Sequence, residues 1–241
     1  MRLDEELVRR GLCASRARAR DSVLRGAVKV DGVVITKPAR PVGPGQVIGI
    51  DDPAAAYVSR SALKLAAALD AFGFDPGGRV CLDVGASTGG FTQVLLRRGA
   101  AVVYAVDVGR DQLSPVIAGD SRVVMMEGVN ARDLDASQIP DRPGAIVIDV
   151  SFISQRLVLP AVLALAAPGS FLVSLVKPQF EVGREHVGKG GIVRDKEAAA
   201  AALLAVEDTI RSLGFRPCGR IDSPIEGGDG NREFLIGAVN G

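Results

Sequence analysis

Tryptophan is absent from the 241 residues, and His186 is the only histidine. A zinc site built from several histidines is therefore excluded. A Ser-His-Asp hydrolase would depend on His186 alone, which lies in a glycine-rich stretch. Aromatic residues make up 4% of the chain against 47% for hydrophobic residues as a whole, so we expect a core of Ala, Val, Leu and Ile.

Cysteine is also scarce. Cys13, Cys81 and Cys218 are far apart and form no C-x-x-C pair, which favours reduced thiols in a cytoplasmic protein. The charged N-terminus shows no secretory signal or transit peptide. The longest uncharged run, 157–176, is interrupted by Pro160 and by a Pro-Gly-Ser sequence, so we expect a helix and a strand there and no membrane span.

Charge is distributed unevenly along the chain. Residues 1–50, which we call the basic head, carry ten Lys or Arg and five Asp or Glu, a net charge of +5. The remaining residues carry 19 basic and 23 acidic side chains, a net charge of −4. A basic segment joined to a mildly acidic body indicates an anionic partner for the segment.

The basic head has the pattern of two helices and a hairpin. Leu3 and Leu7 repeat at helical spacing, with Gly11 as the end of that helix. Ser15 is a suitable N-cap for a second helix that runs to about Arg25. Three predicted strands complete the head: 27–30 and 33–36, which flank an Asp-Gly hairpin turn, and 46–50.

Residues 7–35 (LVRRGLCASRARARDSVLRGAVKVDGVVI) resemble, along nearly their whole length, the small RNA-binding module named after a ribosomal small-subunit protein, the S-four-like fold. The resemblance implies that the basic head binds RNA, and the alternative is a solvated basic helical hairpin. The side chains expected to contact phosphates are Arg9, Arg10, Arg16, Arg18, Arg20 and Lys29.

Residues 80–92, VCLDVGASTGGFT, combine a buried strand, a glycine-rich turn and the start of a helix, as in the ligand-binding corner of a doubly wound sheet. Their Asp-x-Gly-x-x-x-Gly spacing differs from the dinucleotide pattern, in which an acid would oppose the pyrophosphate. The stretch resembles the S-adenosylmethionine loop of Rossmann-like methyltransferases, and the alternative is a turn without a ligand. The resemblance implies cofactor contacts by Asp83, Gly85, Ser87, Thr88, Gly89, Gly90 and Phe91.

Strands and helices alternate after residue 57, which predicts an α/β fold with a seven-stranded doubly wound sheet whose last strand is antiparallel. We expect a small α+β domain at 1–52, a linker at 53–58 and the larger domain at 59–241. The predicted strands are 80–84, 102–106, 123–126, 145–150, 170–176, a weaker 216–221 and 233–239, and the predicted helices are 57–72, 91–98, 155–167 and 196–213.

Polar residues stand where the predicted strands end. Asp107 is placed to bind the ribose hydroxyls of a nucleoside cofactor, and Asn130 lies near the expected adenine. Asp149 and Lys177 close two further strands, and Glu233 begins the last one, so an antiparallel last strand would bring it to the same edge. Each side chain also has an ordinary alternative as a helix cap or a solvated residue, and their joint placement is what indicates a site.

Six motifs together are typical of one family: SRSALKL (59–65), LDVGASTGGFT (82–92), IDVSFIS (148–154), LVKPQFEVG (175–183), VGKGGIVRD (187–195) and GNREFL (230–235). The chain resembles the TlyA family, which joins an RNA-binding head to an FtsJ-like ribose 2′-O-methyltransferase, over essentially its whole length. The resemblance implies a catalytic tetrad of Lys64, Asp149, Lys177 and Glu233, S-adenosylmethionine as cofactor, no metal, and ribosomal RNA or a ribosomal subunit as partner. The Ser-Ala pair at 61–62 stands where glycines are expected, which puts only the fine positioning of Lys64 in doubt.

The implied reaction requires alignment and the handling of one proton, because a ribose 2′-hydroxyl is a poor nucleophile and a sulfonium methyl is already a good electrophile. Lys177 is expected to act as the base or to orient the hydroxyl. A lysine is a poor base near its reference pKa of ~10.4, so a base role needs a neighbouring cation, Lys64, and partial burial. Longer relatives modify both ribosomal subunits, so this shorter chain is expected to modify a cytidine of the large-subunit RNA.

Three alternatives stay open. Amine-directed base methyltransferases usually have Asn or Asp followed by Pro-Pro-aromatic at the end of this strand, whereas this chain has Val-Ser-Phe after Asp149. A cytosine-C5 methyltransferase would need a cysteine nucleophile, here Cys218, in the crevice. A membrane-damaging haemolysin would need a span or an amphipathic basic helix, and the sequence offers neither. A ribosome-binding protein without catalysis is disfavoured by the intact tetrad.

Overall fold

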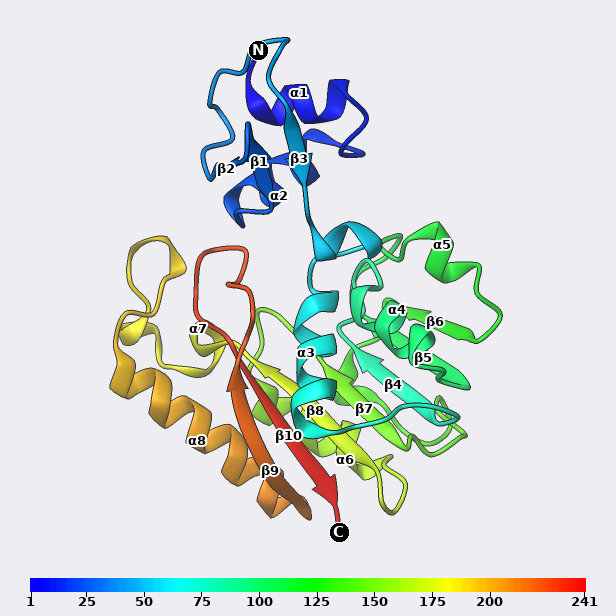
Figure 1. Ribbon diagram of the computed structural model, residues 1–241. Coiled ribbons are helices and arrows are strands. Elements are labelled where there is room, and N and C mark those ends of the chain that lie inside the picture. The colour runs from blue at the N-terminus through cyan, green and yellow to red at the C-terminus, as the bar shows by residue number, and fades with distance from the viewer. The chain divides into compact units, whose positions relative to one another are not determined.

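The computed structural model describes residues 1–241 and divides the chain into two compact units, Met1–Ala56 and Tyr57–Gly241 (Figure 1). Each unit has its own buried hydrophobic cluster, and the larger unit has one on each face of its sheet.

The first unit packs two helices and a small antiparallel sheet around one core. Its elements are α1 (Leu3–Arg9), α2 (Arg16–Leu24), β1 (Val28–Val30), β2 (Val33–Val34) and β3 (Ile48–Ile50), with the strands in the order β2-β1-β3. The residues that bury the helices against the sheet are Leu3, Leu7, Ala19, Val23, Val28, Val30, Ile35 and Val42.

The local sequence signals of the basic head are confirmed. The Ser15 hydroxyl accepts a hydrogen bond from the backbone N–H of Arg18 at 3.3 Å, which caps α2. Asp31 and Gly32 have φ values of 51° and 82°, as a two-residue hairpin turn between β1 and β2 requires.

Beyond β3 the chain remains packed on the first unit for several residues. Arg25 donates to both carboxylate oxygens of Asp52, at 2.8 and 2.7 Å. A 3₁₀ turn, η1 (Pro53–Ala56), then ends the unit.

The second unit is built on a seven-stranded sheet in the order β6-β5-β4-β7-β8-β10-β9. Strands β4 to β8 are parallel, and β10 is antiparallel to both of its neighbours, which confirms the predicted doubly wound α/β sheet with an antiparallel last strand. The strands are β4 (Val80–Val84), β5 (Val102–Asp107), β6 (Val123–Glu127), β7 (Ala145–Ile148), β8 (Phe171–Val176), β9 (Phe215–Asp222) and β10 (Phe234–Asn240).

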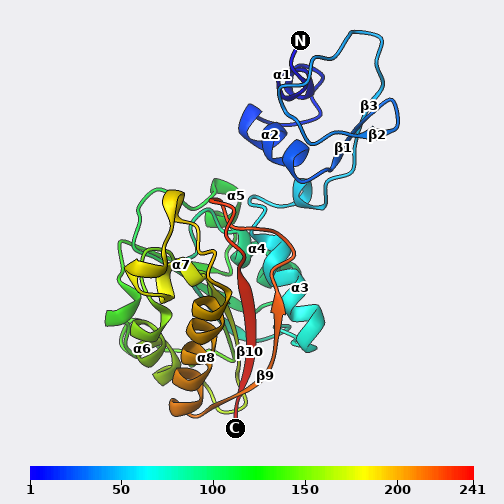
Figure 2. The same ribbon diagram turned by 90° about the vertical axis from the view of Figure 1, so that its left-hand side faces the viewer.

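Helices cover both faces of this sheet. One face packs against α3 (Ala62–Phe72), α4 (Gly90–Arg97) and the short α5 (Pro115–Ala118), and the other against α6 (Leu159–Ala164) and α8 (Lys196–Ser212). Figure 2 shows α3 on one side of β10 and both α6 and α8 on the other. The remaining short elements are α7 (Pro178–Glu181), η2 (Ala131–Asp133), η3 (Gln155–Leu157), η4 (Arg184–His186) and η5 (Lys189–Gly191).

Some predicted elements have different bounds in the structure. The helix predicted at 57–72 begins only at Ala62. The helix predicted at 155–167 is divided into η3 and α6, because Pro160 lies in the first turn of α6 and restricts the residue before it. The weak strand predicted at 216–221 is a full strand, β9, because it pairs with β10 along its length.

The uncharged run at 157–176 is divided between α6 and β8, as predicted. No helix of the protein combines the length and the apolar character needed to cross a membrane.

Candidate active site

The carboxyl ends of the parallel strands meet the start of β10 at one edge of the sheet. Strands β8 and β10 pair at Val176 and Phe234, so Lys177 and Glu233 occupy neighbouring positions just beyond the ladder. Asp149 follows the end of β7, the strand next to β8. The topology therefore gathers three of the four predicted tetrad residues at this edge, as the antiparallel last strand required.

Lys177 and Asp149 form an ion pair at the end of β8 and β7. The Lys177 Nζ lies 2.6 Å from Asp149 Oδ1 and donates a hydrogen bond to Ser151 Oγ at 2.8 Å. The two charged side chains are 11% and 15% exposed, so the ammonium is fixed between two oxygens and still borders solvent.

Lys64 and Glu233 form the second ion pair of the predicted tetrad. Lys64 comes from α3, and both side chains are buried. Ser61, which stands where a glycine was expected, bonds through its hydroxyl to Ser59 Oγ at 3.0 Å and leaves the Lys64 contact intact. A side chain at Gly90 would collide with Ser61 Oγ, so the glycine of α4 makes room for the serine of α3.

The glycine turn after β4 is required by the packing of the sheet itself. Gly85 has a φ of +86°, and a Cβ at this position would collide with the carbonyl oxygen of Asp149. Gly89, with a φ of +91°, is the N-cap of α4 and packs closely on Ile117. Sequence reasoning assigned these glycines to the ligand, and the structure shows that the neighbouring chain segments require them as well.

Asp83 is fully buried beneath this turn. Its Oδ2 accepts a hydrogen bond from the Thr92 hydroxyl of α4 at 2.6 Å, and its Oδ1 has no hydrogen-bond partner. Burial raises the pKa of the Asp83 carboxyl to about 7 against the opposing Thr92 hydrogen bond, and the nearby Asp149 carboxylate raises it further. An orphan carboxylate oxygen in this position suits a cationic ligand group.

Asp107 organises the loops beside the turn. Its two carboxylate oxygens accept hydrogen bonds from the backbone N–H groups of Gly109 and Ser87, at 2.7 and 2.8 Å. Ser87 has a positive φ of 46°, which is uncommon outside glycine, and its N–H points at the carboxylate. Each carboxylate oxygen has a second lone pair, so Asp107 retains capacity for the two hydroxyls of a ribose.

Two adjoining cavities lie along this edge. The larger, of about 550 Å³, is bordered by Asp107, Asn130 and the segment after β7. The smaller, of about 180 Å³, is bordered by Lys177 and by Ser59 of the segment before α3. The four residues that border both are Gly85, Ser87, Asp149 and Ser151.

The remaining predicted cofactor residues lie at different distances from these cavities. Thr88 and Phe91 border the smaller cavity, whereas Gly89 and Gly90 border neither. Asn130 borders the larger cavity, and its side-chain oxygen accepts from the backbone N–H of Arg132 at 3.1 Å to start η2.

Phe152 is a site residue that sequence reasoning did not single out. It has a positive φ of 64°, its side chain is 90% exposed, and it borders the larger cavity. Its ring lies 5.1 Å from that of Phe180, so one face of an aromatic pair stands at the rim. An exposed ring on strained backbone could be recognised only from coordinates, because the sequence Val-Ser-Phe carries no signal for positive φ.

Glu181 is a second residue that sequence reasoning missed, although it lies in the LVKPQFEVG motif. It is buried and accepts hydrogen bonds from Ser154 Oγ at 2.6 Å and from the backbone N–H of Gln155 at 2.7 Å. Burial raises the pKa of Glu181. Its contacts tie the segment after β8, which carries Lys177, to the segment after β7, which carries Asp149.

The predicted RNA-contacting residues of the basic head differ in their surroundings. Arg10 donates to Glu6 at 2.7 Å and to the carbonyl of Gln46 at 2.9 Å, so it holds the head together. The other five are exposed or partly exposed. Arg9 pairs with Glu6, Arg16 with Asp4 and Glu5, Arg18 donates to the carbonyl of Ala54, and Arg20 and Lys29 make no ion pair.

Comparison with known proteins identifies both units. Residues 57–239 match the FtsJ-like methyltransferase family, and residues 1–48 match the S4 domain. The 16S/23S rRNA (cytidine-2′-O)-methyltransferase TlyA of Mycobacterium tuberculosis is 47% identical over 98% of this chain and 88% of its own length. Hemolysin A of Brachyspira hyodysenteriae is 42% identical over 98% of both chains.

Among solved structures, a putative hemolysin from Streptococcus thermophilus is 40% identical in sequence to this chain. Its fold matches with a TM-score of 0.78 over 100% of this chain and 88% of that one.

Replacement of the buried carboxyl, Asp83→Asn, is expected to change how stability depends on pH. The pKa of Asp83 is raised on folding to about 7. Protonation of Asp83 contributes its full free energy of stabilisation below about pH 4, the pKa of an Asp in the unfolded chain. That contribution is lost as the pH rises through 7. The melting temperature of Asp83→Asn relative to the native protein should therefore increase between pH 5 and pH 8. An exposed control, Asp229→Asn, should show no such trend, and a constant difference for Asp83→Asn would contradict the assignment.

Proposed function

The chain belongs to the FtsJ-like methyltransferases and, with its S4 domain, to the TlyA group among them, and on this basis we propose that it is an S-adenosylmethionine-dependent ribose 2′-O-methyltransferase of ribosomal RNA. A cytidine is the proposed target nucleoside, as in the name of the mycobacterial relative. The proposal places the enzyme in the cytoplasm, with ribosomal RNA or a ribosomal subunit as its partner.

The observation that carries the proposal is the pair of adjoining cavities. They share Gly85, Ser87, Asp149 and Ser151, while Asp107 borders only the larger one and Lys177 only the smaller. A nucleoside held by Asp107 in the larger cavity and a hydroxyl beside Lys177 in the smaller one would meet at the shared wall. This is the arrangement that transfer between two separately bound molecules requires.

The residues of the larger cavity fit S-adenosylmethionine. Asp107 borders the cavity and retains lone pairs for the ribose hydroxyls. Asp83 borders neither cavity but lies buried beneath the glycine turn with an unpartnered oxygen. Asp83, Asp107 and Asp149 together favour a ligand that carries positive charge. When bound, the cofactor supplies a methyl group on a positively charged sulfur, which needs no further activation.

Lys177 is the residue that we propose to act on the substrate hydroxyl. Asp149 and Ser151 hold its Nζ at the end of β8, so the hydroxyl is aligned by hydrogen bonding to an ammonium or amine of fixed position. The buried Lys64–Glu233 pair holds the start of β10 against α3, which fixes the opposite side of the same edge. Where the Nζ of Lys177 is an amine, it accepts the proton of the hydroxyl and then releases it to solvent. Where it is an ammonium, it aligns the hydroxyl and the proton leaves directly to solvent.

The basic head is proposed to hold the RNA. It matches the S4 domain, and its exposed Arg20 and Lys29 make no ion pair within the chain. Neutralised phosphates release counterions, so a net charge of +5 over residues 1–50 provides affinity that does not depend on sequence.

The first test concerns the cofactor. Asp107→Ala is expected to weaken S-adenosylmethionine binding, because two ribose hydroxyls lose a charged acceptor. A hydrogen bond to a charged group contributes about 1.5–3 kcal/mol, or roughly a tenfold to hundredfold change in affinity. Isothermal titration calorimetry of the full chain measures this, with Asp141→Ala as a control outside both cavities. Equal affinity of the two variants would refute a role for Asp107.

The second test concerns catalysis. Lys177→Ala is expected to abolish methyl transfer, because the hydroxyl loses its aligning partner. Cofactor binding should persist. Lys177→Arg should fail as well, since arginine keeps its proton at working pH. Transfer is followed with labelled cofactor on ribosomal RNA, and mass spectrometry of the nucleosides locates the methyl group. Near-native activity of Lys177→Arg would leave Lys177 an orienting role only, and a methylated base would refute the reaction.

The third test concerns the basic head. Arg16 is engaged with Asp4, so Arg20→Glu with Lys29→Glu is the cleaner charge reversal. RNA affinity should fall, and the slope of log affinity against log salt should become shallower by roughly 0.7–0.9 for each lost phosphate contact. The control, Arg142→Glu with Arg216→Glu, makes the same charge change on exposed residues of the second unit. Identical salt dependence of the two double variants would exclude the head as the RNA-docking element.

A further inference from the structure

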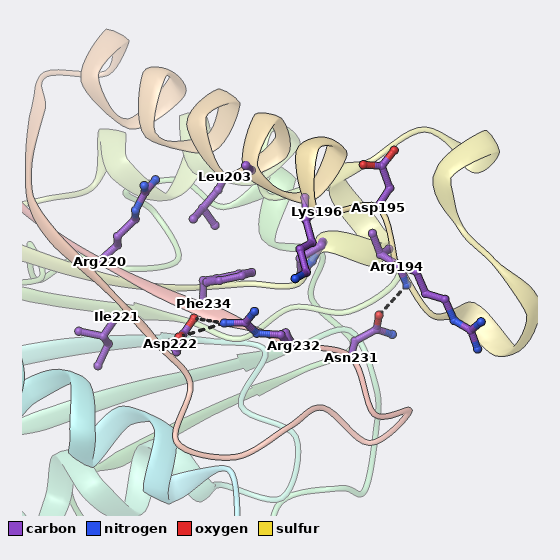
Figure 3. Close-up of a pocket in the computed structure, with 14 residues that line it drawn as sticks. Arg194, Asp195, Lys196, Leu203, Arg220, Ile221, Asp222, Asn231, Arg232 and Phe234 are labelled. Carbon is purple, nitrogen blue, oxygen red and sulfur yellow. Dashed lines mark hydrogen bonds and ion pairs between the residues drawn. The ribbon is translucent and has the colours of Figure 1, made fainter.

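A third cavity, of about 470 Å³, lies on the α8 face of the sheet and outside the candidate active site (Figure 3). It is bordered by the first turns of α8, by the ends of the β9–β10 hairpin and by residues 193–195. Figure 3 shows Leu203 directed from α8 toward the cavity, with Phe234 of β10 on the opposite wall.

The rim of this cavity is positively charged. Four cationic side chains border it against two carboxylates: Arg194, Lys196, Arg220 and Arg232 against Asp195 and Asp222.

The two carboxylates of the rim are already engaged. Asp195 caps α8 by accepting from the backbone of Glu197 and Ala198, both at 3.0 Å, and Asp222 pairs with Arg232 at 3.1 Å. Arg194 and Lys196 make no ion pair, and Lys196 projects toward the cavity in Figure 3. Arg220 lies 3.7 Å from Glu207 and Arg232 pairs with Asp222, so the uncompensated positive charge of the rim is that of Arg194 and of Lys196 at the start of α8.

The walls below this rim are apolar. Leu203 and Phe234 form an apolar surface between the charged groups. The guanidinium of Arg232 lies 5.7 Å from the centre of the Phe234 ring and forms a cation–π contact with it. Apolar and aromatic surface for a flat ring, beside cations for a phosphate, is the recognition chemistry of a nucleotide in a single strand.

The cavity is continuous in the chain with the candidate active site. Pro178 borders it and directly follows Lys177, and Phe234 borders it and directly follows Glu233. The end of the β8–β10 ladder thus has the catalytic side chains at its edge and this cavity on its α8 face.

The wall formed by residues 193–195 is held in place by a buried side chain. Asn231, which is 2% exposed, accepts from the backbone N–H of Val193 at 2.9 Å and donates to the carbonyl of Gly191 at 2.8 Å. Asn231 precedes Glu233 by two residues, so the same short segment positions the cavity wall and the active-site acid. This contact joins the VGKGGIVRD and GNREFL motifs through residues outside the tetrad.

We propose that this cavity binds a nucleotide of the substrate RNA that flanks the methylated one, with its base against Phe234 and Leu203 and its phosphate at Lys196 and Arg232. The proposal rests on the proposed function, since it names how the same RNA is held beyond the reacting ribose. It adds a second RNA contact in the methyltransferase unit, distinct from the basic head.

Two substitutions on α8 test the proposal with a matched control. Ala200 borders the cavity and Ala201 does not, and both are exposed helical residues. Ala200→Glu adds a carboxylate to the cavity wall, whereas Ala201→Glu makes the same change in charge and helix propensity on the neighbouring surface. Binding of a fluorescein-labelled single-stranded RNA of about ten nucleotides to the full chain is measured by anisotropy across a salt series.

Ala200→Glu is expected to weaken RNA binding about tenfold relative to Ala201→Glu at low salt, because the new carboxylate repels the phosphate. Lys196→Ala should reduce the salt slope by about 0.7, the value for one phosphate of a single strand. RNA that contains 4-thiouridine should cross-link on irradiation to peptides covering 196–203 or 232–234.

Equal affinities of Ala200→Glu and Ala201→Glu would overturn the proposal. Inorganic phosphate that displaces the RNA as strongly as cytidine monophosphate does would overturn the nucleotide assignment, because only an anion would then be recognised. Methyl transfer is assayed separately on the same proteins. A native chain that binds the RNA through this cavity but transfers no methyl group would refute the proposed function and leave the cavity assignment standing.

Discussion

The buried ion pair between Lys64 and Glu233 is the constraint on which the geometry of the sheet edge depends. It joins the first helix of the second unit to the start of its last strand, across 169 positions of sequence. Desolvation of two charges costs several kcal/mol per ion, so such a pair is weak evidence for stability. Removal of either partner would leave an uncompensated buried charge at a cost of about 3–5 kcal/mol. The pair therefore acts as a specific clamp, because only one arrangement of α3 and β10 satisfies both charges.

The acidic groups at the same edge indicate what kind of ligand the proposed site would accept. Asp83, Asp107 and Asp149 lie at or near the carboxyl ends of three neighbouring strands, and only Asp149 has a lysine partner. The raised pKa of Asp83 reflects both its burial and this neighbouring negative charge. A cation that enters the cavity lowers the energy of all three carboxylates together. A phosphate-bearing dinucleotide would raise it, which agrees with the departure of the loop from the dinucleotide spacing.

The sequence was sufficient to predict the positions of site residues that depend only on residue type and strand order. The tetrad residues could be placed because parallel strands end at one edge and an antiparallel last strand begins there. The sequence was insufficient where a contact depends on two distant segments. Glu181 resembles a solvated loop acid until its bonds to Ser154 and Gln155 are seen, and the strand β9 owes its length to pairing with β10.

Backbone conformation was the other property that sequence patterns could not supply. Phe152 and Ser87 have positive φ values that no local signal indicates. Gly85 was predicted to bind the cofactor, and the structure gives a separate reason for a glycine there, because its missing Cβ accommodates the carbonyl of Asp149. The close approach of two strands and the approach of a ligand leave the same mark in a sequence, a glycine, and coordinates are needed to separate them.

The location of the positive charge follows from the acidity of the edge. A crevice bordered by Asp107 and Asp149, with Asp83 buried beneath it, favours a cationic ligand and disfavours the phosphates of RNA. A large polyanion must then be held by cations that do not line the crevice. The basic head and the rim of Arg194, Lys196 and Arg232 are two such places. On the proposed function, separate groups of cations would hold the RNA while the acidic edge holds the cofactor, and the reacting ribose would be presented to Lys177.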